Sequence, residues 1–230
     1  MNNLDFTNLK ENTTHGDFIL PFSIYKGTLS PSFPSIAAHW HEEIEVIIVL
    51  DGSCDYRINL DSFVINKGDI LIIDSQSLHS LTYIPSKNMT WASFVFNINM
   101  LKSSNTDGAL LKYIAPLLNH EHQLPIILKD NIDCYSKIFD VIEDIIYCYY
   151  EKDIAYELEL KSLLFKFFSL LYKNDLIKKH QSKNNLTINT TDKIKLVLNY
   201  INDHYSEDIS INTLAELCDY SEYHFMRFFK

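Results

Sequence analysis

The chain has 230 residues, of which 47% are hydrophobic and 22% are charged, so it can bury a sizeable core and is not disordered over its whole length. No run of about 18 apolar residues occurs and the first ten residues are polar, which argues against a membrane span or a secretory signal. We therefore expect a cytoplasmic protein. The formal net charge of −10 argues against a broad nucleic-acid-binding surface.

The four cysteines are scattered along the chain without a C-x-x-C pair, at Cys54, Cys134, Cys148 and Cys218. This spacing supports neither a disulfide framework nor a zinc knuckle. We expect all four to be small buried side chains.

Short runs rich in Ile, Val, Phe and Tyr follow one another between residues 18 and 97. No helical pattern separates them, which predicts an antiparallel sandwich or barrel. Asp51-Gly52 and Lys67-Gly68 are expected turns. The expected strands are 18–25, 44–50, 56–60, 63–65, 70–73, 78–84 and 91–96.

Histidines and carboxylates cluster in the run His39-Trp40-His41-Glu42-Glu43-Ile44-Glu45. In an extended strand, residues two apart share a face, so the side chains of His39 and His41 lie roughly 7 Å apart and can converge on one ion. Glu45 has the same parity. If the chain turns near residues 42–43 instead, Glu45 can still point inward from the next strand, and the sequence leaves both arrangements open. Glu43 is expected at a rim or strand end.

This layout resembles the cupin family, whose first motif is H-x-H, three or four residues, Glu, six residues and Gly. The matching residues are His39, His41, Glu45 and Gly52. The Gly expected six residues before the first His is absent. The second motif keeps Gly68 and His79, but Asp74 and Gln76 stand where Pro and Gly are usual. The resemblance implies a β-barrel with a possible metal centre.

Three imidazoles and a carboxylate suit Zn, Ni, Fe or Mn, and the ligand types leave the metal open. The alternative is that these groups line a sugar pocket or form a polar network without an ion. Aromatic faces beside a few polar groups also suit a small organic ligand. By alternation, Trp91 shares one face with Ser93 and Val95, and the sequence does not say whether that face is inside. The candidate ligand-binding residues are His39, His41, Glu45, His79, Tyr25 and Trp91.

After about residue 100 the hydrophobic period changes. Apolar residues recur at three- and four-residue steps from Ile132 to Tyr149, which predicts an amphipathic helix. A second helix is expected over 154–172 and has almost no polar face, so it must be covered on more than one side. We expect its surface between Leu158 and Leu171 to form a dimer interface. The alternative is that it packs wholly within the subunit.

Residues 174–191 are polar and are expected to form a linker. Three helical patterns follow, at 192–205, 210–218 and 221–230. Ser210 and Ser221 are expected N-caps, and two short helices across a tight turn form a helix-turn-helix.

The small Ala215 suits the point where the two short helices cross. Phe225 and Phe229 are expected to face the core of this unit, since they stand four residues apart on the second helix.

The pattern I-S-I-x-x-L-A-x-x-C-x-x-S-x-x-x-F-x-R-x-F-K resembles the first helix-turn-helix of the AraC/XylS family of bacterial transcription regulators. Together with the cupin-like barrel, the resemblance covers essentially the whole chain. It implies base contacts from Tyr223, Met226 and Arg227, with Lys230 on the same exposed face. The family has a second helix-turn-helix after this point, so we expect a truncated chain that binds DNA weakly.

The sequence therefore predicts an α+β fold and a ligand-responsive transcription regulator, not an enzyme. Its effector is a small molecule, a sugar by family resemblance, and the chain is expected to form a homodimer. The alternative is a cupin metalloenzyme, an oxygenase or isomerase, whose metal site consists of three histidines and one glutamate. The expected parts are an arm (1–17), a barrel (18–125), a helical dimerisation region (126–173), a linker (174–191) and an incomplete helix-turn-helix unit (192–230).

Overall fold

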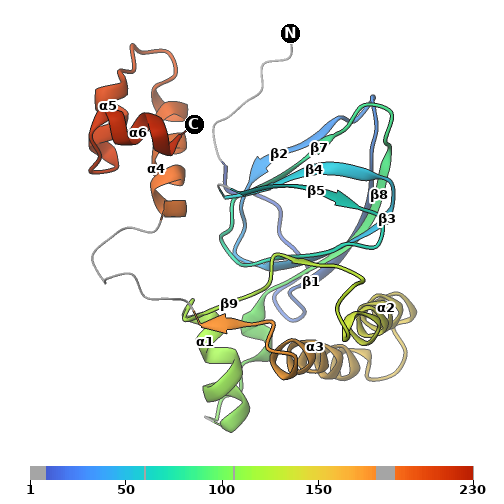
Figure 1. Ribbon diagram of the computed structural model, residues 1–230. Coiled ribbons are helices and arrows are strands. Elements are labelled where there is room, and N and C mark those ends of the chain that lie inside the picture. The colour runs from blue at the N-terminus through green and yellow to red at the C-terminus, as the bar shows by residue number, and fades with distance from the viewer. Residues whose placement is uncertain (1–8, 60, 106, 180–189, 230) are drawn as a thin grey trace.

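The computed structural model describes residues 9–59, 61–105, 107–179 and 190–229. Two antiparallel sheets face each other and enclose the N-terminal half of the chain (Figure 1). The five-stranded sheet has the order β1-β8-β3-β6-β10, and the four-stranded sheet has the order β2-β7-β4-β5. The strands are β1 (Phe22–Leu29), β2 (Ser35–His39), β3 (Ile44–Asp51), β4 (Ser53–Ile58), β5 (Asp61–Asn66), β6 (Ile70–Ile73), β7 (His79–Tyr83), β8 (Met89–Phe96) and β10 (Ile127–Leu128).

Strand β3 is central because it pairs with β8 on one side and β6 on the other. Its side chains alternate between two buried faces. Ile44, Val46 and Ile48 pack toward the helices, whereas Ile47 and Val49 pack between the two sheets. This double burial explains why the sequence there is an almost unbroken apolar run.

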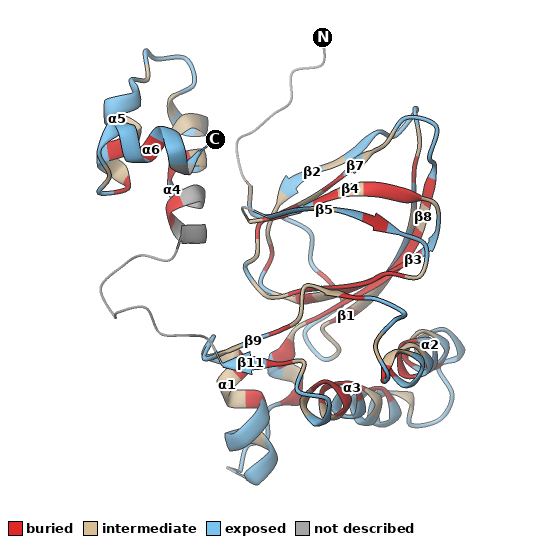
Figure 2. Ribbon diagram, in the orientation of Figure 1, coloured by how far each residue is buried: buried red, intermediate tan, exposed pale blue. Residues whose placement is uncertain are grey.

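Two helices, α2 (Tyr135–Glu151) and α3 (Tyr156–Lys173), lie side by side across the outer face of the five-stranded sheet (Figures 1 and 2). Aromatic contacts join the layers: the Phe94 and Phe167 ring centroids are 6.5 Å apart, and those of Phe96 and Phe168 are 6.2 Å apart. Each such pair contributes about 0.5–1.5 kcal/mol beyond the burial of its area.

Helix α3 is covered mainly within the subunit, by the sheet on one side and α2 on the other. Among the apolar residues that led us to expect a dimer surface, Leu158 and Phe165 stay exposed, at 72% and 40%. Packing within the subunit, the alternative to a dimer interface, therefore covers most of the apolar surface of α3. No helix among the described residues is long and apolar enough to cross a bilayer.

The expected turns at Gly52 and Gly68 are confirmed, both with positive φ. The expected first strand, 18–25, was placed too early. Asp17 accepts hydrogen bonds from the backbone amides of Ile19 and Leu20, which closes a turn and leaves Phe18 fully exposed. Strand β1 begins at Phe22 instead and continues to Leu29. Strand β2 was not predicted, and Leu60, at the end of the expected strand 56–60, lies outside the described residues.

Residues between the sheets and α2 contain short helical segments and further strand pairing. Strand β10 belongs to the five-stranded sheet, so sheet pairing continues past residue 125. After α3, β11 (Lys178–Lys179) pairs with β9 (His122–Gln123), so this part of the expected linker 174–191 has backbone partners. Residues 180–189 of that linker lie outside the described residues. The short helices are η1 (Ile98–Leu101), η2 (Leu110–Ile114) and α1 (Ala115–Leu118).

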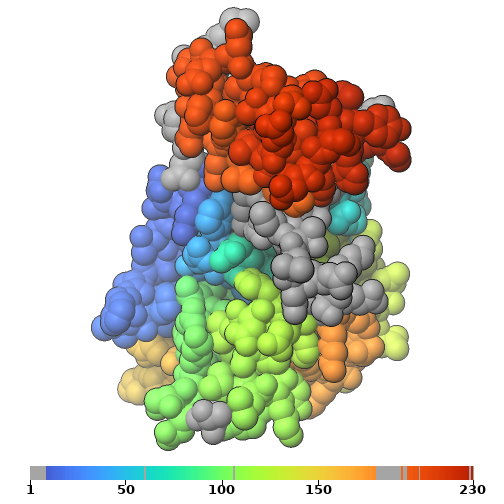
Figure 3. Space-filling model, turned by 90° about the vertical axis from the view of Figure 1, so that its left-hand side faces the viewer, coloured from blue at the N-terminus to red at the C-terminus, as the bar shows by residue number. Residues whose placement is uncertain are grey.

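The C-terminal helices α4 (Thr190–His204), α5 (Ile211–Leu217) and α6 (Glu222–Phe228) have their own small core. They form the lobe at the top of Figure 3. Ser210 and Ser221 are confirmed as N-caps, since their side chains accept from backbone amides three residues on. Ala215 is buried, as expected.

A buried lysine holds the turn between α5 and α6 to α4. The Lys193 ammonium donates to the Cys218 carbonyl oxygen at 2.6 Å and lies 4.0 Å from the centroid of the Tyr220 ring. Phe225 is buried as expected, but Phe229 is 37% exposed. Phe229 is the C-cap of α6 and packs against Phe225 with its ring tilted by 31°, so its position past the helix end takes it out of the core.

We predict that Gly52→Ala destabilises the fold by about 2 kcal/mol or more. Its φ is +77°, and an added Cβ would lie 1.6 Å from the Asn88 carbonyl oxygen, so backbone strain and overlap act together. Urea denaturation measures the change. Gly108→Ala is the control, because beyond its chain neighbours and its own helix backbone no described heavy atom lies within 4 Å of its Cβ position, and its stability is expected to be unchanged or slightly raised. Equal stability of the two variants would contradict the prediction.

Candidate ligand-binding site

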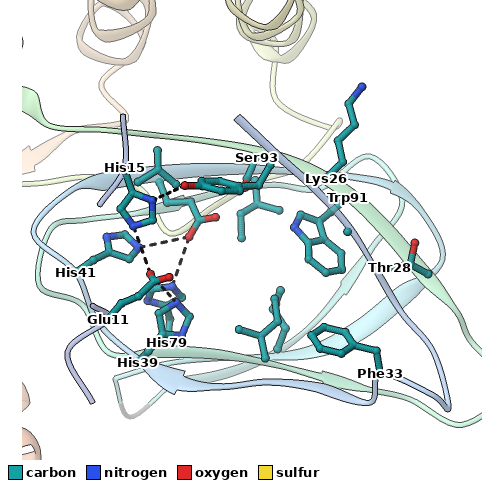
Figure 4. Close-up of a pocket in the computed structure, with 17 residues that line it drawn as sticks. Glu11, His15, Lys26, Thr28, Phe33, His39, His41, His79, Trp91 and Ser93 are labelled. Atoms are coloured by element: carbon teal, nitrogen blue, oxygen red, sulfur yellow. Dashed lines mark hydrogen bonds and ion pairs between the residues drawn. The ribbon is translucent and has the colours of Figure 1, made fainter. Parts of the chain in front are cut away.

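A pocket of about 330 Å³ lies between the two sheets (Figure 4). One end is polar and holds the histidine cluster, and the other end is apolar. The structure places all six candidate ligand-binding residues on its wall. The lining residues are Glu11, His15, Tyr25, Lys26, Gly27, Thr28, Phe33, Ile36, His39, His41, Glu45, Ile47, His79, Leu81, Trp91, Ser93 and Val95.

The chain turns between His39 and Glu45, which settles the alternative that the sequence left open. Strand β2 ends at His39, β3 begins at Ile44, and Glu45 points inward from β3. His39 pairs with His79 across the four-stranded sheet, with ring centroids 4.2 Å apart. His39, His41 and His79 each offer one ring nitrogen, and these three nitrogens all lie within 4.8 Å of one another.

The three histidines are oriented in the same way by the backbone. Each Nδ1 lies within hydrogen-bond distance of a carbonyl oxygen two residues away: 2.8 Å for His39, 3.1 Å for His41 and 2.9 Å for His79. A carbonyl oxygen only accepts, so each ring donates its Nδ1–H, and Nε2 of the neutral imidazole keeps its lone pair. Backbone bonding of this kind is typical of histidines that ligate metals.

Glu45 faces two of these Nε2 atoms. Its Oε2 is 3.5 Å from Nε2 of both His41 and His79, and both nitrogens are buried without a hydrogen-bond partner in the part of the chain that the structure describes. A nitrogen lone pair that faces a carboxylate oxygen is unfavourable unless a proton or a cation lies between them. The site is therefore suited to hold positive charge.

The shifted pKa values of Glu45, His41 and His39 arise from burial and from the closeness of these groups to one another. Burial opposes ionisation of Glu45, but the interaction of its carboxylate with His41 and His79, once these rings carry a proton on Nε2, outweighs burial and holds the pKa of Glu45 below its ordinary value. Burial likewise opposes a charged His41, yet the Glu45 carboxylate raises the pKa of His41. Burial, followed by the proximity of His79, lowers the pKa of His39.

Two residues of the N-terminal segment also belong to the cluster, and the sequence analysis did not find them. Glu11 Oε2 lies 3.3 Å from His15 Nε2 and 3.8 Å from His39 Nε2. The contact with His15 is the main cause that lowers the pKa of Glu11 to about 2. No motif marks these residues. They reach the pocket because residue 10 forms a parallel bridge with Trp40, a long-range pairing that local pattern does not reveal.

The apolar end is built by strands β1 and β8. Trp91, Ser93 and Val95 face the pocket, whereas Phe94 and Phe96 pack toward the helices, which settles the alternation along β8. The indole ring of Trp91 lies over Gly27, its partner in the β1–β8 pairing.

Two hydroxyls face the same cavity. Tyr25 pairs its hydroxyl with His15 Nδ1 at 2.9 Å. Ser93 Oγ is buried and finds no hydrogen-bond partner within residues 9–59, 61–105, 107–179 and 190–229.

The residues expected to contact DNA lie on one exposed face of α6. Tyr223 is 68% and Met226 50% exposed, and Arg227 is exposed with its guanidinium 5.8 Å from the centroid of the Tyr223 ring. Lys230 lies outside the described residues. The four cysteines are buried and free.

Residues 30–168, more than half of the chain, match the AraC-like ligand binding domain. The chain belongs to the AraC family. Its ligand-binding part has the cupin-like barrel that the sequence predicted.

Two relatives of this AraC-family chain come from Bacillus subtilis (strain 168) and are named uncharacterized HTH-type transcriptional regulators. YdeC is 26% identical over 97% of this chain and 75% of its own length. YbfI is 22% identical over 89% of this chain and 67% of its own length. A cupin protein from Bacteroides fragilis aligns with 38% of this chain and 75% of its own at 18% identity, with a TM-score of 0.33. The family and these names support a ligand-responsive regulator.

We predict that Gly27→Ala displaces the Trp91 indole. An added Cβ would lie 2.2 Å from the ring, so the ring must move and the fold loses about 1–3 kcal/mol. In a Trp40→Phe background, Trp91 is the only tryptophan, and its fluorescence maximum reports the displacement. Adding Trp91→Phe, which shortens the ring, is expected to restore most of the stability. A Gly27→Ala spectrum identical to that of the background would contradict the prediction.

We predict that Asp74→Asn raises the free energy of unfolding at pH 7. Burial raises the pKa of Asp74 from 3.8, so the fold favours the protonated carboxyl and loses stability as pH rises through that pKa. Asn keeps the oxygen that accepts from the Ser75 amide at 2.8 Å. Urea denaturation from pH 3 to pH 7 measures the effect, which is expected to vanish well below pH 3.8.

The control is Asp17→Asn, for which the opposite sign is expected. Backbone hydrogen bonds from Leu20 and Ile19 lower the pKa of Asp17, so its contribution is present at neutral pH and is lost on acidification. Equal pH profiles for the two variants would show that the assigned cause is wrong.

Proposed function

We propose that the chain is an effector-responsive transcription regulator in which the pocket binds a small polar molecule, a sugar. The observation that carries this is a set of buried polar atoms on the pocket wall that have no hydrogen-bond partner among the described residues: Nε2 of His15, His41 and His79, and Ser93 Oγ. Such atoms are unfavourable unless a ligand or water satisfies them. Sugar hydroxyls can bond to Ser93 Oγ, and to the histidine nitrogens where no cation occupies them, while the aromatic faces of Trp91 and Phe33 cover the apolar side of a sugar ring.

The effector signal has a physical route toward the C-terminal lobe. The Ile72 amide in β6 donates to the Ile126 carbonyl oxygen at 3.0 Å, close to β9. Strand β9 in turn pairs with β11, the last described element before α4. A change in the five-stranded sheet therefore reaches the chain that leads to the DNA-binding helices. The effector changes DNA binding by this route if it binds two conformations of the chain with different affinities.

A divalent cation, Zn, Ni, Fe or Mn, is proposed as a resident of the polar end. His39, His41, His79 and Glu45 would hold it, and the unpartnered Nε2 atoms that face a carboxylate fit that role. When bound, the cation supplies a Lewis acid that attracts an oxygen atom of the effector. The Nδ1–carbonyl bonds keep the three rings turned toward that place.

Dimerisation through α2 and α3 is proposed as the way in which two DNA-binding lobes are spaced. Exposed large apolar side chains on these two helices support it, since exposed apolar surface can mark interaction sites. They are Tyr147, Tyr150, Leu158 and Phe165. DNA contacts are proposed for Tyr223, Met226 and Arg227, with Lys230 as the expected fourth.

We predict that a thermal-shift screen of sugars and divalent metals on the chain finds ligands that raise its Tm. A ligand at 100 times its Kd stabilises the native state by about 2.7 kcal/mol. His39→Ala/His41→Ala is expected to lose the shift. His204→Ala/His224→Ala, which removes two imidazoles from the C-terminal lobe, is the matched control and is expected to keep it. Equal shifts in wild type and in the pocket variant would contradict the assigned site.

Regulation is tested with the same ligands on DNA binding. Fluorescence anisotropy with a library of short duplexes at low salt is expected to give an affinity that changes when the effector is added. Arg227→Ala is expected to lower that affinity and reduce its salt dependence. Turnover of the ligand by the metal-loaded chain would favour the metalloenzyme alternative and overturn the regulator.

A further inference from the structure

The N-terminal segment 9–17 is attached beside the mouth of the pocket by backbone and side-chain bonds. The Trp40 amide donates to the Leu9 carbonyl oxygen at 2.8 Å, and the Glu11 amide donates to the Trp40 carbonyl oxygen at 2.9 Å. Lys10 pairs with Glu42 at 2.9 Å on the outer side. Residue 40 lies between His39 and His41, so this attachment fixes the segment against the histidine cluster itself.

Glu11 faces inward from that attachment. Figure 4 shows its carboxylate between His15 and His39, with contacts of 3.3 Å and 3.8 Å to their Nε2 atoms. Nε2 of His39 keeps its lone pair, because Nδ1 of that ring donates to the Ala37 carbonyl oxygen. In the pair of His39 and Glu11, an unprotonated Nε2 faces a carboxylate oxygen. Glu45 faces Nε2 of His41 and of His79 in the same way.

His15 is bonded differently from the other three histidines. Its Nδ1 meets the Tyr25 hydroxyl at 2.9 Å, and a hydroxyl can donate. With the Tyr25 hydroxyl donating to Nδ1, His15 carries its proton on Nε2, which lies 3.3 Å from Glu11 Oε2 and has no hydrogen-bond partner among the described residues. His15 is 6% exposed and its ring lies 5.3 Å from that of His41, so packing holds it in place. His15 therefore orients the Glu11 carboxylate.

We propose that Glu11 is an additional ligand of the cation in the histidine cluster and that His15 is its positioning residue. This rests on the metal centre proposed above. The cation then joins three parts of the chain, the N-terminal segment, the turn before β3 and the start of β7, and its binding stabilises the attachment of segment 9–17. A carboxylate on each side of the histidines also balances the charge of a divalent ion in a poorly solvated site.

The test is titration of the metal-free chain with Zn²⁺ and with Ni²⁺ by calorimetry, in wild type, Glu11→Gln and His15→Phe. Glu11→Gln is expected to raise Kd at least 10-fold, and His15→Phe by about 10-fold, the usual effect of losing a group that orients a ligand. Glu43→Gln is the matched control. Glu43 lies 3.9 Å from Nδ1 of His41, on the carbonyl side of the ring, so its loss is expected to leave Kd within about twofold.

Hydrogen exchange of the Glu11 and Trp40 amides gives a second measurement that does not depend on function. Metal is expected to slow their exchange in wild type and not in Glu11→Gln. A Glu11→Gln Kd within twofold of wild type, or metal binding without slower exchange, would overturn the inference while the four-residue metal site stands. If wild type binds neither ion, the metal site and this inference both fail, and the effector screen still tests the regulator independently.

Discussion

The arrangement depends on one constraint, which is that strand β3 is buried on both faces. Ile44, Val46 and Ile48 are held by the helical layer, and the intervening residues face the pocket. Since side chains alternate strictly, slipping the pairing by one residue would move Glu45 into the apolar layer beneath α2 and α3. The packing of that layer therefore fixes the register that brings Glu45 to the histidines.

The polar end and the apolar end of the pocket are controlled by different parts of the fold. Backbone carbonyls of Ala37 in β2, of Glu43 in the turn before β3 and of Ser77 in the loop before β7 orient the imidazoles. The register between β1 and β8 sets the other end, where Trp91 lies over Gly27. The histidines thus owe their geometry to local hydrogen bonds, whereas the apolar wall owes its shape to long-range strand pairing.

Much of this could be predicted from the chain. The strand periods, the turns at Gly52 and Gly68, the capped helices and the H-x-H motif are local signals, and the structure contains them. The start of β1 was missed because Asp17 closes a turn within an apolar run. Glu11 and His15 were missed because a bridge to residue 40 places them, and no local pattern encodes such a contact. Helix α3 was expected to need a partner subunit because apolar residues surround almost its whole circumference. The hydrophobic pattern along the helix does not show that the sheet and α2 cover it.

The Trp91 indole packs on Gly27, which has no side chain. This contact suggests how the size of the pocket can differ among relatives of this chain. Exchanging side chains at positions 27 and 91 would alter the length and outline of the cavity floor without disturbing the imidazoles at the opposite end. Two neighbouring positions on paired strands thus offer a route by which the receptor could be retuned to larger or smaller molecules. The chemistry that binds their polar groups would be inherited unchanged.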